Sequence, residues 1–409
     1  MSTSTTTSTT VSQPAPAPKL KGRARLAELL ANDLRAVPVI AGLLVLVIYF
    51  SSQSDVFLSS RNISNLLVQT VVTGTIALGI VFVLLLGEID LSVAAISGLC
   101  SVVMAKLVVA QGWGNVNAVV IAVLLGIALG AFTGLWSTRF LVPSFVVTLG
   151  AGLVLNGIQL MVLPRSGRYT LVNSGIDHIA GSYLTGAKSW ACVVVAGGLV
   201  LGLRLTAHLR RLKNGIDSSL LRSVVLHTVL ATAAGLVVVA VLNANEGVPL
   251  PVAIFAVLLA GATYVLTETR FGLHLYAVGG NEEAARRAGI NVTLVKVLAF
   301  AISGGLAALA GIIAASRILG VSVSSGGGIG GGALLLNAIA AAVIGGVSLF
   351  GGRGRASAAL LGALVIGTVS NGLNLLGVST DVQLIVTGGL LVLAVTVDRS
   401  IERMTTASR

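Results

Sequence analysis

The sequence has very few charged residues for its length. Only 10% of the 409 residues are Asp, Glu, Lys or Arg, whereas apolar residues make up 55%. A soluble domain carries about 25% charged residues, so this chain could not cover its own surface if water were its only solvent. The scarcity of charge therefore excludes an ordinary soluble protein and predicts a lipid environment. The 50 glycines agree with this, because glycine lets membrane helices approach closely.

Cysteine is also scarce, and the signatures of enzymatic chemistry are missing. Cys100 and Cys192 both lie in apolar stretches, without the spacing of a metal site or a redox pair. No Gly-Lys-Ser or Gly-Lys-Thr completes a nucleotide-binding P-loop. We therefore predict no catalytic residue, no metal and no cofactor bound by this chain. The net charge of +12 is spread between apolar stretches and over both ends, so nucleic-acid binding is not expected.

Long apolar stretches dominate what is present. A membrane-spanning helix needs about 20 mostly apolar residues, and twelve stretches meet or nearly meet that length. They lie at 34–53, 64–86, 91–110, 116–138, 144–163, 189–208, 221–243, 250–267, 293–315, 333–350, 356–377 and 380–397. The sequence predicts an all-α polytopic membrane protein with about 12 (10–12) transmembrane helices. The stretch 333–350 is short and glycine-rich, which also fits a re-entrant or broken helix.

The positions of lysine and arginine predict the orientation and the segments of the chain. With both termini in the cytoplasm, 20 of the 26 lysines and arginines fall in inner segments, as the positive-inside rule requires. Residues 1–33 are predicted to be a disordered or amphipathic cytoplasmic segment, 34–397 the transmembrane domain, and 398–409 a cytoplasmic tail. Within the domain, 204–222 is a basic cytoplasmic loop and 268–292 is a second inner loop.

The inner loop 268–292 is predicted to contain a short helix. Asn281 is suited to cap it, acidic residues then occupy its first turn, and Gly289 is suited to stop it. Such a helix can dock on a cytoplasmic partner, or it can be an ordinary solvated loop helix. The candidate docking residues are Asn281, Glu282, Glu283, Ala284, Ala285, Arg286, Arg287 and Gly289.

Two acids interrupt a long apolar region. Glu88 and Asp90 lie between the second and third apolar stretches, within Leu86–Ser92. An acid inside the membrane costs roughly 2.5–3.5 kcal/mol on insertion scales, which makes it a functional candidate. The alternative is a tight inner turn between two spans, and a broken helix facing a cavity would reconcile both interpretations.

Hydroxyl side chains follow Pro143 at the start of the fifth stretch. Ser144 and Thr148 are four residues apart and therefore share one face of the predicted helix. Hydroxyls on one face can line a polar path through the membrane. They can equally bond back to the carbonyl groups of their own helix.

Six segments together resemble one family. The ribose/xylose/arabinose-type permeases of bacterial ATP-binding-cassette importers are similar to this chain from about Val37 to Val397. Two features make the chain most similar to the xylose type: Glu88, and an additional basic loop and span at 204–243. The additional segment would raise the family's usual ten spans to twelve. The segments are Gly87–Val93, Pro143–Gly150, Thr269–Gly272, Tyr276–Ala285, Ala338–Gly346 and Ser348–Gly354.

The resemblance implies a function and a set of partners. The chain would be the permease subunit of an ATP-driven importer of a monosaccharide, a pentose such as xylose, in the bacterial inner membrane. It would pair with a second permease protomer in a homodimer surrounded by lipid, and an extracytoplasmic sugar-binding protein would deliver the sugar. A separate ATPase subunit, which uses ATP and Mg²⁺, would dock at Glu283–Gly289. The implied substrate path includes Asp90, Ser92, Ser144, Thr148 and Asn337, where Asn337 replaces the aspartate expected in the family.

An ion-coupled secondary sugar transporter is the alternative function. It would need a buried acid as the coupling site, and Asp90 could serve. It would have no need of a docking helix in the loop 268–292.

Overall fold

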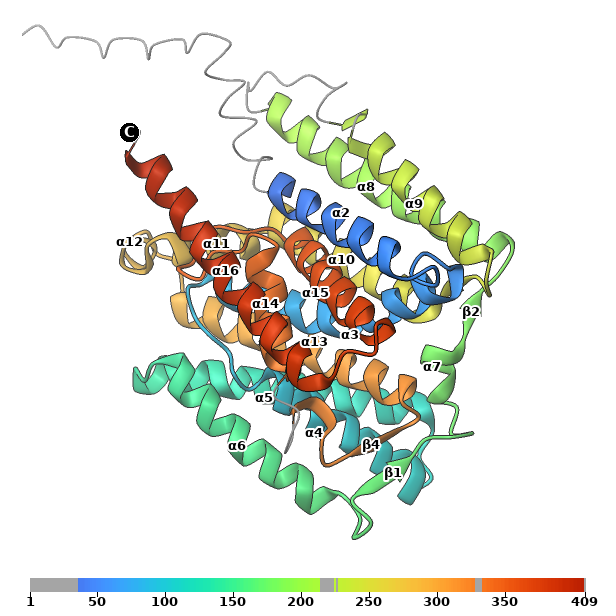
Figure 1. Cartoon of the computed structure of the whole chain (residues 1–409). Coiled ribbons are helices and arrows are strands. Elements are labelled where there is room, and N and C mark those ends of the chain that lie inside the picture. Colours follow the sequence, from blue (N-terminus) through green and yellow to red (C-terminus); the bar gives the residue numbers. More distant parts are fainter. Residues whose placement is uncertain (1–35, 214–223, 226, 328–332, 408–409) are drawn as a thin grey trace, which may run out of the picture.

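Every predicted apolar stretch contains a helix in the computed structural model, because a lipid-embedded backbone must satisfy its own hydrogen bonds. The structure describes residues 36–213, 224–225, 227–327 and 333–407 (Figure 1). The predicted segment 1–33 and the part of the predicted loop 204–222 that follows residue 213 lie outside these residues. Eight of the described helices are long and apolar enough to cross a membrane.

The main helices follow one another through the bundle with short connections. They are α2 (Ala36–Gln53), α3 (Ser60–Leu85), α4 (Val93–Ala105, continued by a π-turn over Lys106–Ala110), α5 (Asn115–Phe140), α6 (Ser144–Val162), α8 (Ala187–Lys213), α9 (His227–Asn243), α10 (Leu250–Glu268), α13 (Val292–Arg317), α14 (Ala333–Ile344), α15 (Ser357–Leu375) and α16 (Thr380–Ala407). The short helices are α7 (Asp177–Gly181), α11 (Arg270–Gly280) and α12 (Glu282–Arg287), with a 3₁₀ turn at Ser325–Gly327.

Three helix boundaries differ from the sequence-based expectations. Helix α8 continues to Lys213, so residues 204–213 of the predicted loop 204–222 are helical. Helix α14 covers only 12 residues of the stretch 333–350. At 1.5 Å per residue it is roughly 18 Å long, well short of the ~30 Å hydrocarbon core. Helix α16 continues to Ala407, ten residues beyond the predicted end of the transmembrane domain at 397. The residues after 397 contain no Gly or Pro that would end a helix.

The interior of the bundle consists of α3, α4 and α13, with α5 and α15 packed against them. Small residues determine how closely these helices approach. On α5, Gly126 and Gly130 lie against the backbone of α13 at Phe300 and Gly304, where an added Cβ would overlap a carbonyl oxygen. Glycine at these positions therefore replaces side-chain interdigitation by backbone contact, which is typical of membrane helices.

The hairpin formed by α8 and α9 lies at the periphery (Figure 1). Its two helices pack mainly on each other, and they share a small separate cluster of buried residues that contains Val193, Val239 and Leu242. This is the region in which the sequence predicted an additional span. The structure therefore adds it beside the bundle rather than within it.

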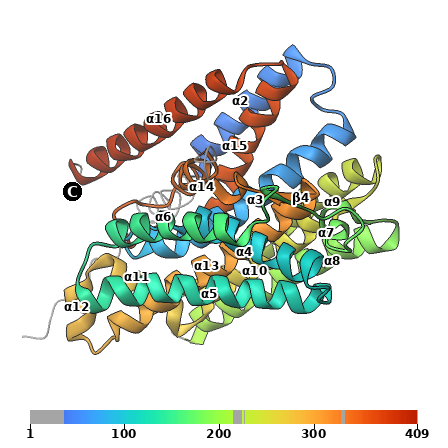
Figure 2. The same cartoon turned by 90° about the horizontal axis from the view of Figure 1, so that it is seen from below.

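Two short antiparallel ribbons lie at the end of the molecule opposite α12 (Figures 1 and 2). Strand β1 (Arg168–Thr170) pairs with β4 (Gly320–Ser322), and β2 (Tyr183–Leu184) pairs with β3 (Val248–Pro249). We call this end the ribbon end and the other the α12 end. The C-terminal end of α16 points to the α12 end in both views.

Candidate functional site

The chain is broken between α3 and α4, at the position of the two acids. Residues 87–92 form an irregular, non-helical segment instead of a continuous helix, and Gly87 begins it with a φ of 77°. Such a segment leaves backbone groups that the two flanking helices cannot satisfy. We call 87–92 the break, and its neighbours must supply the missing hydrogen bonds.

Helix α6 supplies several of these hydrogen bonds through the two predicted hydroxyls. The Ile89 amide donates to Ser144 Oγ (3.3 Å), and the Leu91 amide donates to Thr148 Oγ1 (3.0 Å). Thr148 Oγ1 also lies 3.3 Å from the Ile89 carbonyl oxygen, to which it can donate. Both hydroxyl side chains are buried. Thr148 Oγ1 also lies 3.4 Å from the Phe145 carbonyl of its own helix, as one of the two sequence interpretations allowed. Neither interpretation had included the bonds that fix the backbone of the neighbouring break.

Asp90 joins the break to two interior helices. Its Oδ1 accepts from the Ser92 amide (2.9 Å) and from Ser92 Oγ (2.6 Å) at the start of α4, and its Oδ2 accepts from Ser303 Oγ of α13 (3.3 Å). Asp90 is only 2% exposed. The Asp90 side chain thus holds the start of α4. Among the described residues, no lysine or arginine forms an ion pair with it. Asn337 is half-buried on α14, and none of its side-chain atoms bonds to this cluster among the described residues.

The short helix α12 forms where the sequence predicted it. Asn281 caps it by accepting a hydrogen bond from the Ala284 amide (2.9 Å), and Glu282 and Glu283 occupy the first turn. Gly289 ends it with a φ of 82°, and the Ile290 amide then bonds to the Ala285 carbonyl. Two pairs along the helix, Glu282 with Arg286 and Glu283 with Arg287, add modest support at 2.9 and 3.0 Å.

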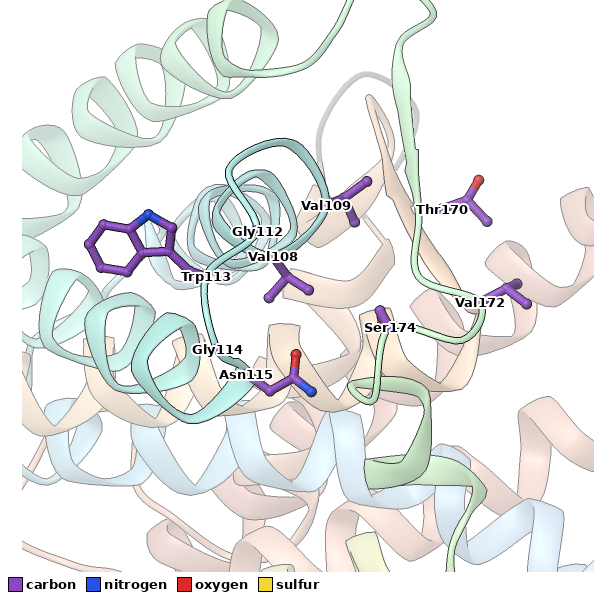
Figure 3. Close-up of a pocket in the computed structure, with 9 residues that line it drawn as sticks. All are labelled: Val108, Val109, Gly112, Trp113, Gly114, Asn115, Thr170, Val172 and Ser174. Carbon is purple, nitrogen blue, oxygen red and sulfur yellow. The ribbon is translucent and has the colours of Figure 1, made fainter.

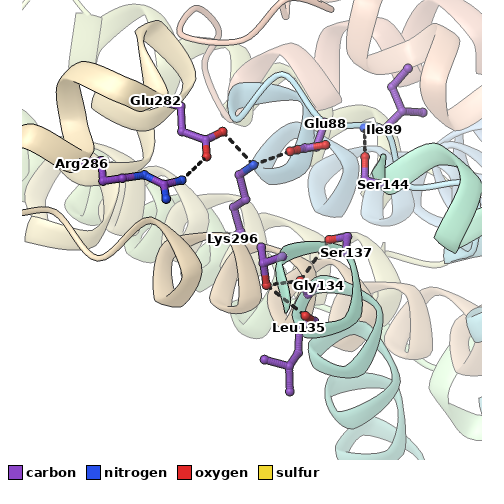
Figure 4. Close-up of polar contacts among 10 residues, drawn as sticks. Glu88, Ile89, Gly134, Leu135, Ser137, Ser144, Glu282, Arg286 and Lys296 are labelled. Carbon is purple, nitrogen blue, oxygen red and sulfur yellow. Dashed lines mark hydrogen bonds and ion pairs between the residues drawn. The ribbon is translucent and has the colours of Figure 1, made fainter. Parts of the chain in front are cut away.

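Lys296 connects α12 to the break (Figure 4). From the second turn of α13, its Nζ lies 2.7 Å from Glu88 Oε1 and 2.9 Å from Glu282 Oε2. Partial burial of Glu282 opposes its ionisation, but the hydrogen bonds and charges of Lys296 and Arg286 outweigh that effect and lower the pKa of Glu282. One ammonium group therefore joins two carboxylates from segments far apart in the sequence.

A glycine-rich loop meets the same region. The Gly352 amide donates to the Leu85 carbonyl at the end of α3 (2.8 Å), and Tyr276 of α11 donates its hydroxyl to the Gly354 carbonyl (2.8 Å). Gly279 lies so close to the Leu85 carbonyl that an added Cβ would overlap it. The end of α3, the α11–α12 corner and the loop 348–354 are therefore packed backbone to backbone.

Sequence analysis missed Lys296 and the loop 348–354 as parts of this site. The only available signal for Lys296 was a lysine within the first turns of a long apolar stretch. Its partner Glu88 lies 208 residues away in the chain. For the loop, the glycines indicated close packing but not the segments against which they would pack.

A shallow pocket opens at the ribbon end (Figure 3). It has a volume of about 460 Å³, and its lining includes Trp113, Asn115, Thr170 and Ser174. The loop after α4 and the segment around β1 provide these residues. The lining thus offers hydroxyl and amide groups at this end of the molecule, while the Trp113 indole points away from Thr170 and Ser174 (Figure 3).

Comparison with known proteins decides the family. The family described as branched-chain amino acid transport system / permease component matches residues 62–395. The chain belongs to this permease family. The xylose transport system permease protein XylH of Escherichia coli (strain K12) is 38% identical over 297 residues, which cover 72% of this chain and 75% of that protein.

Other relatives of this permease carry related names. XylH of Haemophilus influenzae is 37% identical over 310 residues, covering 73% of this chain and 80% of that protein. The ribose import permease protein RbsC of Escherichia coli (strain K12) is 35% identical over 289 residues, covering 70% and 71%. No solved structure matches the chain. The matches confirm the resemblance to sugar permeases, nearest to the xylose type, and the permease is a multi-pass protein of the inner membrane.

Proposed function

We propose that this permease carries a pentose such as xylose into the cell as the membrane subunit of an ATP-driven importer. The observation that carries the proposal is the 38% identity to a xylose permease over 72% of the chain. The sugar is a neutral molecule rich in hydroxyl groups, so hydrogen-bonding groups rather than fixed charge suit its path. The twelve-helix topology with both termini in the cytoplasm belongs to the same proposal.

Helix α12 is the proposed docking site for an ATPase subunit, which would bind and hydrolyse ATP with Mg²⁺. The inward side of the helix is anchored, since Ala285 is 5% exposed. Its other side is open, because the side chains of Glu283 and Arg287 are 63% and 79% exposed. A rigid, capped helix with charged residues of both signs at its surface is suited to a complementary groove on a soluble partner. This geometry meets the requirements of a docking helix, and the variants below distinguish it from a solvated loop helix.

The break is the proposed part of the permease that shapes the sugar path. Asp90 and Ser92 bond to each other within the break, and Ser144 and Thr148 bond to its backbone, so their contribution would be to position this segment beside the path. Asn337 has a carboxamide free of these bonds and would contact the sugar directly. Broken helices are the usual places at which transporters bind cargo at membrane depth.

The ribbon end is the proposed site for an extracytoplasmic sugar-binding protein, because it lies opposite α12. A second permease protomer and lipid would cover the exposed apolar faces of the bundle, which include Phe145, Leu149 and Leu153 on α6. In this arrangement, ATP binding and hydrolysis at the α12 end would switch the sugar path between a state open to the outside and a state open to the cytoplasm.

Sugar uptake in proteoliposomes tests the proposed function. The vesicles contain the permease with the ATPase subunit from the same transport system, with and without the binding protein, and xylose, ribose, arabinose and leucine are compared. We expect ATP-dependent xylose uptake that needs the binding protein. Uptake that ignores ATP and follows a proton or sodium gradient would instead support the secondary transporter, with Asp90 as its coupling acid. Preferred uptake of leucine would contradict the pentose assignment.

Two variants test the docking helix within the same experiment. Glu283→Arg places a third positive charge on the exposed surface, and Gly289→Pro is incompatible with a φ of 82° because proline fixes φ near −65°. Both should abolish ATP-dependent uptake while the protein still inserts. Gly289→Asn is the matched control, since asparagine tolerates positive φ, and it should retain most uptake.

A further inference from the structure

The ion bridge of Lys296 is more enclosed than the other ion pairs of α12. The side chain of Lys296 is 12% exposed and that of Glu88 is 23% exposed, whereas the arginines that pair along α12 are 60% and 79% exposed. Exposed pairs are screened by water and salt, but enclosed ones hold their geometry more firmly. Among the described residues, this enclosed bridge is also the only ion-paired link from α12 to another part of the chain.

The bridge reaches the break at its first acid, and the break is held again at its second. Glu88 binds Lys296 near the start of α13, and Asp90 accepts from Ser303 two turns further along the same helix. The break is therefore attached to α13 at two points. Helix α6 fixes its backbone on either side of Asp90, through Ser144 at Ile89 and Thr148 at Leu91. A displacement of Glu88 must consequently be shared by the whole segment up to Ser92.

We propose that Lys296 is a positioning residue that couples the docking helix to the break. The inference rests on the proposed function, in which an ATPase subunit moves α12. Movement of Glu282 would be transmitted through the Lys296 ammonium to Glu88, and from there along the break to Asp90 and the first turn of α4. In this role Lys296 acts through the two carboxylates that it contacts, Glu88 and Glu282.

Removing one group from the bridge has effects that differ by position. Lys296→Met leaves Glu88 and Glu282 without their shared cation, so the two carboxylates repel each other and the link is lost. Glu88→Gln keeps the Lys296–Glu282 pair and removes only the link to the break. Lys296→Arg retains a cation that can engage both carboxylates. Lys106→Met is the matched control, since Lys106 is another helical lysine and forms no ion pair with any described residue.

The first readout is the coupling of ATP hydrolysis to transport in the assembled complex. For Lys296→Met and Glu88→Gln, we expect the sugar moved per ATP hydrolysed to fall about three- to thirtyfold, the range typical of coupling residues. The double variant should lose no more than Lys296→Met alone, because both changes remove the same link. Lys296→Arg should recover most of the coupling, and Lys106→Met should keep the wild-type ratio.

The second readout does not depend on the identity of the sugar. Hydrogen exchange of backbone amides is followed with a non-hydrolysable ATP analogue and Mg²⁺ bound to the ATPase. In the wild type, we expect nucleotide to change exchange at both 281–289 and 87–92. In Lys296→Met the change at 281–289 should remain and that at 87–92 should be lost.

Two results would overturn the proposal. One is a normal coupling ratio per assembled complex in Lys296→Met, with activity lost only in proportion to the amount of ATPase that co-purifies, because the bridge would then be merely structural. The other is a nucleotide-dependent change at 87–92 that survives in Lys296→Met. Failure of the wild-type complex to move sugar with ATP would count against the proposed function instead, and the exchange measurement would still decide the role of Lys296.

Discussion

Glycine has different roles in two regions of the molecule. One is the contact between α5 and α13, which we call the seam, and the other is the hairpin of α8 and α9. In the seam, Gly130 and Gly304 face backbone atoms at distances that exclude any side chain. In the hairpin, an added Cβ at Gly198 or Gly202 would meet nothing within 4 Å. The most apolar part of α13 is 72% buried and that of α8 only 6% buried. Glycine is therefore a steric requirement in the seam and only a compositional feature at Gly198 and Gly202. In the hairpin, Gly197 does lie against a neighbour, since its added Cβ would be 2.8 Å from Thr232 Oγ1.

The largest expected effect comes from filling the seam. Gly304→Leu would force α13 away from α5, because the contacting atoms belong to backbone that cannot rotate aside. We expect a loss of about 3 kcal/mol or more, which is the upper range for overpacking, and little folded protein after extraction. Gly198→Leu is the matched control, and its leucine should face lipid without cost. Size-exclusion profiles and thermal unfolding in detergent measure both, and equal behaviour of the two variants would refute the contrast.

A smaller effect should follow from a single hydroxyl that supports the break. Thr148→Val leaves the Leu91 amide without its acceptor in a buried site, which costs about 1–3 kcal/mol. Thr267→Val is the control, because the Thr267 hydroxyl is exposed and bonds only to its own helix at the Thr263 carbonyl. Thermal unfolding should therefore separate the two valine variants. Similar melting temperatures would show that the break obtains its hydrogen bonds elsewhere.

The contrast between interior and periphery also explains how far sequence reasoning could go. The positions of the helices follow from local apolar runs, and the cap at Asn281 and the stop at Gly289 follow from local turn chemistry, so all of these were predictable. The contacts of the break were not predictable. Ser144 lies 55 residues from Ile89 in the chain, and no local pattern indicates that its hydroxyl will accept from that amide.

The same limit applied to the polar pairs between helices. Asn371 lies within the predicted span 356–377, where a neutral amide can serve as a ligand group or as a link between helices. The structure pairs its side chain reciprocally with Asn62 of α3, at 2.9 and 3.0 Å, in a buried position. This exchange satisfies one donor and one acceptor on each amide and links α3 to α15. Only the three-dimensional arrangement could choose between the two interpretations.

At the periphery, the cap of α12 should have a moderate effect. Asn281→Ala removes the acceptor for the Ala284 amide, and loss of an N-cap costs about 1 kcal/mol locally. Because α12 is short, we expect this to appear as faster hydrogen exchange at 282–288 and weaker binding of the ATPase subunit, with little change in global unfolding. Asn281→Ser should preserve the cap and the binding. A global loss of stability in Asn281→Ala would show that α12 supports the interior.

The smallest effect should come from the exposed pair on α12. Glu283 and Arg287 lie 3.0 Å apart with most of their surface in water, and such pairs contribute about 0.3–0.5 kcal/mol. Arg287→Gln should therefore leave the melting temperature of the isolated permease almost unchanged, and 0.5 M salt should erase the remaining difference because exposed charges are screened. Lys296→Gln, measured alongside, should lower the melting temperature clearly and with little dependence on salt. Suppose instead that Arg287→Gln lowered the melting temperature of the isolated permease as much as Lys296→Gln. Burial of the Lys296 bridge would then not explain its contribution to stability, and the contrast between interior and periphery would hold for glycines but not for charged residues.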